Sequence, residues 1–287
     1  MKKLIAASIE NAVLLCYNLY TDIFREGEIF MKIVTFNLRC VWDKDGINSF
    51  IHRAGMIYDK IREEMPDIIA FQECTPRSME LMEKMFPEYS FSGMFRSENY
   101  WGEGLFTAVR KEDFRIASAE SFWISPTPYV PGSRFPEQSD CPRICNAVVV
   151  RNRKTDKMIR LFNIHLDHIS EAARVKGMDF MLGKMAEYNK QLPLPSVILG
   201  DFNCTPESEP IKMCVACENP VLFDVTAGIE CTNHDFGRFD GCSAKKIDYI
   251  FVTQELNKSF RSVTVWDTCH DGIYLSDHYP VCAEFEY

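Results

Sequence analysis

The chain has 287 residues, of which 46% are hydrophobic and 25% charged, and its formal net charge is −9. This size and composition are typical of a globular protein that can bury a sizeable core. Because proteins grip duplex DNA non-specifically through a basic surface, the acidic balance disfavours a general nuclease.

Twelve cysteines are scattered along the chain, which is too long and too sparsely bridged to be a disulfide scaffold. They indicate reduced thiols and a cytoplasmic location. Cys214 and Cys217 have the CxxC spacing, but no second pair with zinc-site spacing lies near them. We therefore expect both to be core cysteines.

Residues 1–30 differ in character from the rest. Their apolar run suggests a signal peptide, but Glu10 and Asn11 interrupt it and no small-residue cleavage site follows. The run is also too short and polar for a membrane span, so we expect no stable membrane association. Glu26-Gly27-Glu28 requires purine-rich codons where a bacterial ribosome-binding site would precede Met31. We expect a bacterial protein that starts at Met31, which the intact mass of the native product would test.

From Met31 onward, apolar strands alternate with segments of helical spacing. A strand over 31–37 precedes a helix over 49–64, which Pro66 ends, and Thr75 is a plausible N-cap for the next helix, with Pro76 at its first position. The remaining elements are a helix over 171–192 and strands over 67–72, 89–93, 105–110, 114–123, 143–152, 159–166, 197–199, 246–252, 260–266 and 279–285. This order predicts one domain with two stacked sheets and flanking helices.

Polar side chains follow several of these strands. Asp201 and Asn203 end an apolar strand, and their spacing in an extended chain would place both on one face. They suit a carboxylate that handles a water proton and an amide that holds a phosphate oxygen, although both are also turn formers. Asp277 and His278 lead into the last strand, where one is suited to bind a metal and the other to reach a phosphate.

Three further strands carry polar groups of this kind. Asp248 opens an apolar strand, where a buried carboxylate needs a partner, and His278 is the candidate. Asn37 and Glu73 follow two other strands and offer the oxygen ligands that Mg²⁺ prefers. His165 shares its strand face with Asn163, which makes the pair candidates for the same site.

The ordered motifs FNLR, FQE, NIHLDH, GDFN, IDYIF and SDHYPV cover residues 31–287. With these motifs in this order, the chain resembles the endonuclease/exonuclease/phosphatase superfamily, which has the fold of deoxyribonuclease I, exonuclease III and neutral sphingomyelinases. The resemblance implies one domain over 31–287 with an α/β fold: a four-layer α/β/β/α sandwich of two stacked mixed sheets flanked by helices.

The same resemblance implies a Mg²⁺ site, which Mn²⁺ may also fill, held by Asn37 and Glu73 with Asp277 near it. Asp201 resembles the residue that activates or orients the attacking water. Asn203 resembles the amide that holds a phosphate oxygen.

The two histidines and their partners have counterparts as well. His278 resembles the histidine that stabilises the phosphorane, with Asp248 orienting it, and His165 resembles a second phosphate-binding histidine. Arg143 ends the long 125–142 loop, where an arginine would clamp a phosphate with two hydrogen bonds, and a surface ion pair is its alternative. Asn163 is a candidate substrate-binding residue.

These features predict a metal-dependent phosphoesterase that hydrolyses a phosphodiester or phosphomonoester by in-line attack of water. Either Asp201 or His278 would act as general base. A small phosphodiester or sugar phosphate is the preferred substrate. The alternatives are a nuclease acting on nucleic-acid ends or abasic sites, and a catalytically inactive protein that binds a phosphate ligand. The sequence leaves the oligomeric state open, and it leaves Trp101-Gly102-Glu103-Gly104 as an unassigned candidate for the rim of the site.

Overall fold

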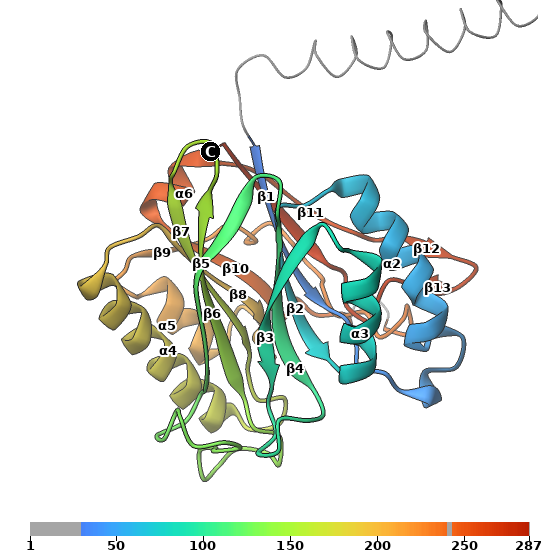
Figure 1. Cartoon of the computed structure of the whole chain (residues 1–287). Helices are drawn as coiled ribbons and strands as arrows, with labels where there is room; N and C mark the ends of the chain where they lie inside the picture. The colour runs from blue at the N-terminus through green and yellow to red at the C-terminus, as the bar shows by residue number, and fades with distance from the viewer. Residues whose placement is uncertain (1–29, 240–242, 287) are drawn as a thin grey trace, which may run out of the picture.

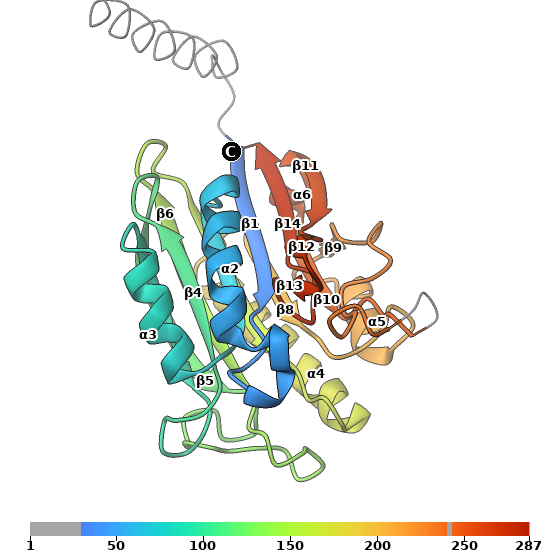
Figure 2. The ribbon, with the colours of Figure 1, turned by 90° about the vertical axis from the view of Figure 1, so that its right-hand side faces the viewer.

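The computed structural model of the protein describes residues 30–239 and 243–286. Two six-stranded sheets pack face to face, and helices cover the outer face of each (Figure 1). In Figure 1, α2 (Phe50–Glu64) and α3 (Pro76–Met85) lie on one side of the stack, with α4 (Glu171–Gln191) and α5 (Glu209–Val215) on the other; Figure 2 looks onto the side of α2 and α3. The expected four-layer α/β/β/α sandwich is thereby confirmed. The expectation for residues 1–30 lies outside the described residues, apart from Phe30.

The first sheet has the strand order β11-β14-β1-β2-β4-β3. Its central pair, β1 and β2, runs parallel, and every other neighbouring pair is antiparallel. Helix α2 connects the parallel pair. The elements of this half are β1 (Phe30–Asn37), η1 (Asp43–Asn48), α2 (Phe50–Glu64), β2 (Ile68–Cys74), α3 (Pro76–Met85), β3 (Tyr89–Phe95), β4 (Gly104–Arg110), β11 (Phe260–Val265) and β14 (Val281–Glu286).

The second sheet repeats this plan with the order β5-β6-β7-β8-β10-β9. Strands β7 and β8 form its parallel pair, and helix α4 connects them. Its elements are β5 (Phe114–Trp123), β6 (Ile144–Asn152), β7 (Met158–His165), α4 (Glu171–Gln191), β8 (Ser196–Asp201), α5 (Glu209–Val215), β9 (Leu222–Asp224), β10 (Asp248–Thr253) and α6 (Gln254–Ser259). A small hairpin, β12 (Cys269–His270) with β13 (Ile273–Tyr274), precedes β14.

Three apolar layers hold the sandwich together. The central strands are apolar on both faces, as strands buried on both sides must be. In β1, Ile33 packs between the two sheets, whereas Val34 packs under α2 and α3. In β8, Val197 and Leu199 face the other sheet, and Ile198 faces α4 and α5. The period-two alternation therefore tells which residues at each strand end point between the sheets.

Local signals in the sequence explain where several elements begin and end. Thr75 caps α3 by accepting from the N–H of Ser78, whose hydroxyl accepts in turn from the N–H of Thr75. Helix α2 ends at Glu64 because Met65 adopts a left-handed conformation immediately before Pro66. The last strand begins at Val281 and not at 279, and Pro280 before it has no N–H to donate.

The cysteines of the described chain are free. Cys214 lies in the core between the second sheet and its helices, and Cys217 packs against that core. Their interpretation as core residues is consistent with this placement. No helix in the described part of the chain is long and apolar enough to span a membrane.

Candidate active site

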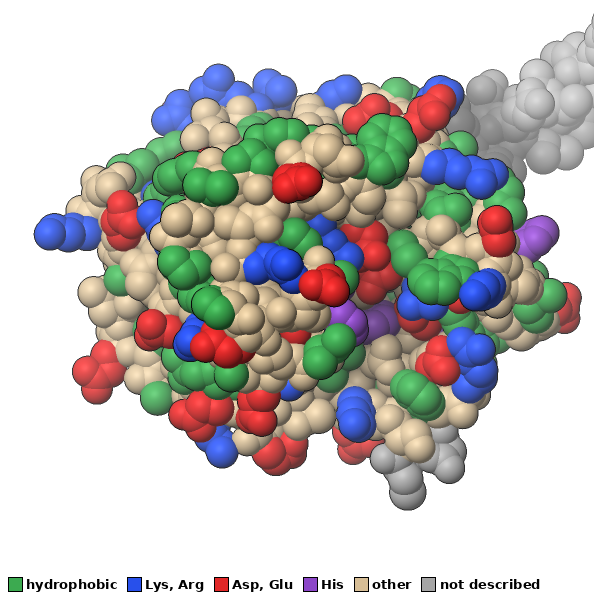
Figure 3. Space-filling view, turned by 90° about the horizontal axis from the view of Figure 1, so that it is seen from below, with side chains coloured by type: hydrophobic (Ala, Val, Ile, Leu, Met, Phe, Trp, Pro, Cys, Tyr) green, Lys and Arg blue, Asp and Glu red, His purple; other side chains and the backbone are tan. Residues whose placement is uncertain are grey.

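The site lies at the edge of the sandwich where the two parallel pairs end. Strands β1 and β2 of the first sheet and β7 and β8 of the second deliver their carboxyl ends there. Viewed toward this edge, histidine, acidic and basic side chains gather around a hollow (Figure 3). The alternation described above turns Asn37, His165, Asp201 and Asp248 toward the space between the sheets. Residues that are distant in sequence therefore meet at one point.

The backbone just before Asp201 requires glycine. Gly200 has a φ of +138°, and a Cβ there would meet the carbonyl oxygen of Ile164 at 1.9 Å. This close approach brings the end of β8 against β7, where Asp201 pairs with His165 in the ladder. On the other sheet, Glu73 adopts a φ of +56° at an irregularity in β2. Glu73 thus sits where a regular strand would not place it, whereas Asp201 keeps the strand register.

Asp248 and His278 form a buried pair. The Nδ1 atom of His278 lies 2.8 Å from Oδ2 of Asp248, and their side chains are 6% and 3% exposed. The other ring nitrogen, Nε2, lies 2.8 Å from Nδ2 of Asn233 and 4.0 Å from Oδ2 of Asp201. The predicted pairing of Asp248 with His278 is present in the structure, and it fixes the ring orientation.

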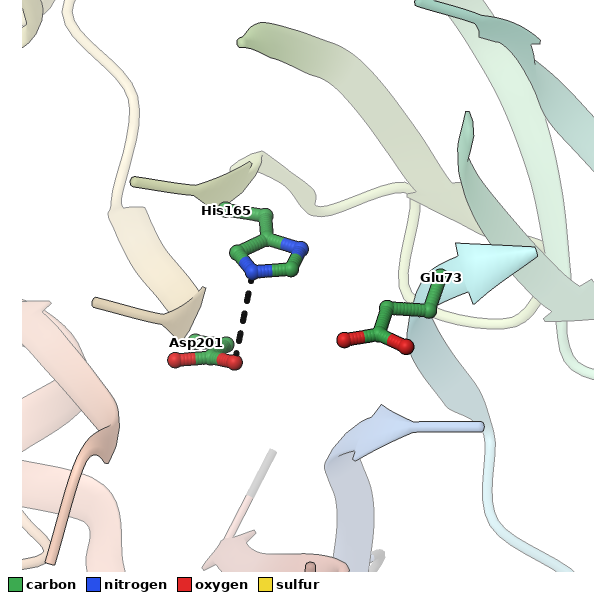
Figure 4. Close-up of side chains that lie close together, drawn as sticks. All are labelled: Glu73, His165 and Asp201. Carbon is green, nitrogen blue, oxygen red and sulfur yellow. Dashed lines mark ion pairs between the residues drawn. The ribbon is translucent and has the colours of Figure 1, made fainter. Parts of the chain in front are cut away.

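A second group of side chains, from both sheets, surrounds Asp201. Asn37 Nδ2 donates to Oδ2 of Asp201 at 3.0 Å and to Oε1 of Glu73 at 3.2 Å. His165 Nε2 lies 3.4 Å from Oδ2 of Asp201. Figure 4 shows the carboxylates of Glu73 and Asp201 and the ring of His165 facing one another across an open space. Asp201, which belongs to the second sheet, is therefore hydrogen-bonded to a residue of the first sheet.

The protonation of these groups follows from their surroundings. Burial disfavours a charged His278, but the adjacent Asp248, together with Asp201 and Asp277, outweighs burial and raises the pKa of His278 well above its usual range. Burial and the neighbouring Asp248 raise the pKa of Asp201 to about 7. His278 is thus cationic at neutral pH, and Asp201 is poised to exchange a proton.

His165 and Glu73 take the opposite states. Burial, with the positive charges of Arg143 and Arg96, lowers the pKa of His165 well below its usual value, so its ring is neutral. Burial alone would raise the pKa of Glu73. The N–H of Cys40, His278, Asn37 and Arg39 together outweigh it and lower that pKa. Glu73 therefore presents an ionised carboxylate to the site.

Asp277 lies on the other side of His278. Its Oδ2 is 3.6 Å from Nη1 of Arg39, and its Oδ1 accepts from the hydroxyl of Ser276. Arg39 is held in turn by both carboxylate oxygens of Asp45, at 3.1 and 3.2 Å. Arg39 thus lies between the carboxylates of Asp45 and Asp277, beside the predicted metal site.

Two predicted residues are placed differently from the expectation. Asn163 is fully buried below the site, where its Oδ1 accepts from Gln72 and its Nδ2 donates to the carbonyl oxygens of Phe71 and Phe106. Its amide is used up in linking the two sheets, which corrects the expectation that it contacts the substrate. Asn203 is not in an extended chain, because its φ is +51°. Its Nδ2 donates to the carbonyl oxygen of Leu166, so a turn and not strand alternation orients it.

Arg143 is 4% exposed, so the surface ion pair considered as its alternative is excluded. Its Nη2 lies 2.9 Å from Nδ1 of His168, and its Nε lies 3.9 Å from Oδ2 of Asp167. Both Nε and Nη1 are buried without a hydrogen-bond partner. Unpaired buried donors of a guanidinium are costly unless water or a ligand accepts from them.

Comparison with known proteins agrees with this geometry. Residues 34–278 match the Endonuclease/Exonuclease/phosphatase family. The chain belongs to this family. Its fold is similar to an endonuclease/exonuclease/phosphatase from Bacteroides vulgatus, with 26% identity, a TM-score of 0.83 and coverage of 90% of this chain and 99% of the other. It is similar to the Bacteroides thetaiotaomicron mannosyl-6-phosphatase, with 25% identity, a TM-score of 0.80 and coverage of 90% and 100%.

A more distant likeness involves a nucleic-acid enzyme. The D. rerio TDP2, solved with a single-strand DNA product, has 18% identity, a TM-score of 0.69 and coverage of 90% of this chain and 99% of the other. This likeness supports the fold alone. Members of the endonuclease/exonuclease/phosphatase family hydrolyse phosphate esters and generally use divalent metal ions.

The residues present fit such an ion. Ligand atoms of Glu73, His165 and Asp201 lie within 4.8 Å of one another, and two of the three are carboxylates, which suit Mg²⁺ or Mn²⁺. Asn37, by contrast, turns its Oδ1 to the N–H of Arg39 and offers N–H groups to the carboxylates. Glu73 is therefore the predicted ligand that the donor set supports best, and Asn37 and Asp277 stay predictions.

Sequence reasoning missed Asn233 and Arg39. Asn233 reaches His278 because the loop that carries it pairs with residues 277–279, where Tyr279 N–H donates to Thr232 and His234 N–H donates to Asp277. No sequence pattern indicates that contact. Arg39 stands two residues after Asn37, and this spacing at a strand exit was a signal that could have found it.

Proposed function

We propose that the protein is a divalent-metal-dependent phosphoesterase that hydrolyses a small phosphorylated substrate by in-line attack of water. The observation that carries this proposal is the position of Asp201. One carboxylate from β8 contacts Asn37 of the first sheet, lies beside His165 and stands 4.0 Å from the His278 ring that Asp248 holds. A proton acceptor, a cationic donor and an anionic ligand pocket thus surround one small space.

We assign the metal to Glu73, with Asn37 and Asp277 as the ligands that the family resemblance implies. Asp201 and His165, whose ligand atoms lie within 4.8 Å of that of Glu73, face the bound ion and stay available to the water and the phosphate. A divalent ion bound there would polarise the phosphoryl group and stabilise charge on its oxygens. The ionised state of Glu73 and its hydrogen bond from the N–H of Cys40 support a carboxylate fixed for this purpose.

Asp201 is the better of the two candidates for general base. Its pKa of about 7 lets it accept a proton from water near neutral pH. His278 is a poor base because Asp248 keeps it protonated. We therefore assign Nε2–H of His278 to donate a hydrogen bond to a non-bridging phosphate oxygen, where it stabilises the negative charge that develops. This requires the Asn233 amide, whose Nδ2 lies 2.8 Å from Nε2, to turn away when the phosphate binds.

The remaining site residues would bind the phosphate. His165, neutral and next to Asp201, donates or accepts one hydrogen bond according to its tautomer. Asn203 lies at the turn after β8, and the second N–H of its amide is the group we assign to a phosphate oxygen. Arg143 has two buried N–H groups without partners, which suit an anionic oxygen.

We propose a sugar phosphate or a similarly small phosphate ester as substrate. The likeness to the Bacteroides thetaiotaomicron mannosyl-6-phosphatase spans 90% of this chain, which supports this class. The net charge of −9 supports a small substrate over a long nucleic acid, because phosphate neutralisation drives the binding of nucleic acids.

The test is hydrolysis of p-nitrophenyl phosphate, bis(p-nitrophenyl) phosphate and mannose 6-phosphate with Mg²⁺ or Mn²⁺, beside plasmid and single-stranded DNA. Glu73→Gln keeps the size of the side chain and removes the charge that we assign to the metal. We expect turnover that requires the metal and is lost in this variant. Turnover without added metal after chelation, or an equally active Glu73→Gln, would contradict the proposal. Preferred cleavage of DNA would replace the substrate class with nucleic acid.

A further inference from the structure

A small cavity opens at the edge of the proposed reaction centre. Its polar lining residues are Glu73, His165, Arg96, Glu103 and Arg143. Its volume is about 10 Å³, which is room for about one water-sized group. A phosphate group or a nucleobase does not fit, but a single hydroxyl does.

The walls of this hydroxyl-sized cavity carry both donors and acceptors. Arg143 contributes a guanidinium whose Nε and Nη1 are buried without a partner. Arg96 and Glu103 form an ion pair, with Nη2 and Oε2 2.9 Å apart and side chains 13% and 27% exposed. Guanidinium groups only donate hydrogen bonds and ionised carboxylates only accept them. A hydroxyl does both, so it is the neutral group that can accept from Arg143 and donate to Glu103 at the same time.

The charges of the residues that line the cavity also favour a neutral ligand group. A cavity built for a second phosphate would gain from Arg96 and Arg143 but lose from Glu103, which adds to the negative charge of Glu73 in the same cavity. Because Arg96 is already paired with Glu103, and Arg143 is assigned to the phosphate that is hydrolysed, little positive charge is left for a second phosphate. A neutral, polar group is therefore favoured over a second anion.

The loop between β3 and β4 holds Arg96 and Glu103 in place. The indole Nε1 of Trp123 donates to the carbonyl oxygen of Arg96 at 2.6 Å, and Arg96 N–H donates to the carbonyl oxygen of Glu103 at 2.8 Å. Tyr100, in the middle of the loop, packs edge-on against the Trp123 ring with centroids 5.8 Å apart. The polar groups are therefore positioned before any ligand arrives, which reduces the entropic cost of binding.

We propose that this cavity binds a hydroxyl group of the leaving alcohol, on a carbon next to the one that carries the phosphate, and so selects phosphates of polyols and sugars over simple alkyl phosphates. The inference rests on the proposed function and deepens it. The cavity shares Glu73 and His165 with the reaction centre. A hydroxyl inside it would be three bonds from the ester oxygen, where glycerol phosphates and sugar 1-phosphates carry a hydroxyl and a nucleotide base cannot reach.

The experiment compares kcat/KM for glycerol 1-phosphate and n-propyl phosphate, which differ by the hydroxyls of the alcohol. We expect the wild-type protein with Mg²⁺ to prefer glycerol 1-phosphate by about 10- to 100-fold, the range for a hydrogen bond to a charged group. Glu103→Leu removes the acceptor at similar size, and Arg96→Leu removes its partner. Each should bring the preference close to the intrinsic difference between the two esters. Glu98→Leu makes the same change at an exposed position of the same loop and should retain the preference.

The outcomes separate the two proposals. If the wild-type protein hydrolyses p-nitrophenyl phosphate but does not distinguish the alkyl phosphates, or if folded Glu103→Leu and Arg96→Leu retain the preference, the hydroxyl cavity is overturned and the phosphoesterase stands. An equal loss on both substrates together with weaker Mn²⁺ binding in a direct titration would assign Glu103 to the metal site and also overturn the inference. No turnover on any phosphate ester would overturn the proposed function and the cavity with it.

Discussion

Replacing Asp248 with asparagine tests the electrostatic role of the Asp248–His278 pair most directly. The two side chains are 2.8 Å apart and 3% and 6% exposed, so solvent screens their interaction little. The substitution keeps the shape of the side chain and removes its charge. Burial, which disfavours a charged His278, is then offset only by the more distant carboxylates of Asp201 and Asp277.

The size of the effect follows from the hydrogen bond that changes. A buried hydrogen bond to a charged group contributes about 1.5–3 kcal/mol. At about 1.4 kcal/mol per pKa unit, the pKa of His278 should fall by about one to two units. Because the reaction needs the protonated ring, the alkaline limb of kcat/KM should move to lower pH by about the same amount. At pH values above the new pKa, the rate should fall roughly 10- to 100-fold.

The assay is a pH–rate profile with p-nitrophenyl phosphate at saturating Mg²⁺, recorded for the wild-type protein, Asp248→Asn and Asp267→Asn. Asp267 is exposed, and its variant controls for the loss of one negative charge. An alkaline limb that stays in place in Asp248→Asn would refute the reasoning, even if the overall rate fell. Such a result would mean that Asp248 orients the ring without setting its charge.

Three further predictions concern stability. Gly200→Ala forces a Cβ against the carbonyl oxygen of Ile164 at a φ of +138°, and thermal unfolding should show a loss of about 2–4 kcal/mol; an unchanged melting temperature would contradict the required glycine. Arg53 is fully buried and donates to the carbonyl oxygens of four residues near the site. Arg53→Met should therefore lower the free energy of unfolding in urea by about 3–5 kcal/mol, whereas Arg62→Met, on the exposed side of the same helix, should lower it by less than about 1 kcal/mol. Equal losses in the two variants would refute this. Burial lowers the pKa of His234 to about 4, so the folded state resists protonation. The free energy of unfolding should therefore fall as the pH drops from about 6.5 to 4, by roughly 3 kcal/mol relative to His234→Gln. Parallel curves of stability against pH for the two proteins would contradict this.

Periodicity and local stop signals were sufficient to predict the main elements. The apolar runs of β1, β2, β7 and β8 are strongly patterned, and Thr75 and Pro66 mark helix boundaries by chemistry that acts within a few residues. The short elements η1, α6, β9, β12 and β13 were not predicted, because two to six residues carry no usable period. Their conformation depends on what packs against them.

Only part of the site was predicted, and the reason is related. Strand alternation correctly indicated that Asn163 and His165 share a face, but it does not tell how far along the strand the solvent begins. Asn163 therefore proved to be a link between the sheets, and His165 lies at the site two residues later. Asn203 was assigned by the same alternation, and there the backbone turned.

The sequence by itself determined which chemical groups the protein carries, the strand ends that bear them and the face that each side chain takes within a regular strand, since these depend on neighbours along the chain. Only the tertiary structure decided which groups meet. The contact between Asn37 and Asp201 joins residues 164 positions apart, and the pairs of His278 with Asp248 and Asn233 require a loop to fold over the last strand. The pKa values of Asp201 and His278 arise from those contacts and from burial, and neither is a property of the local chain.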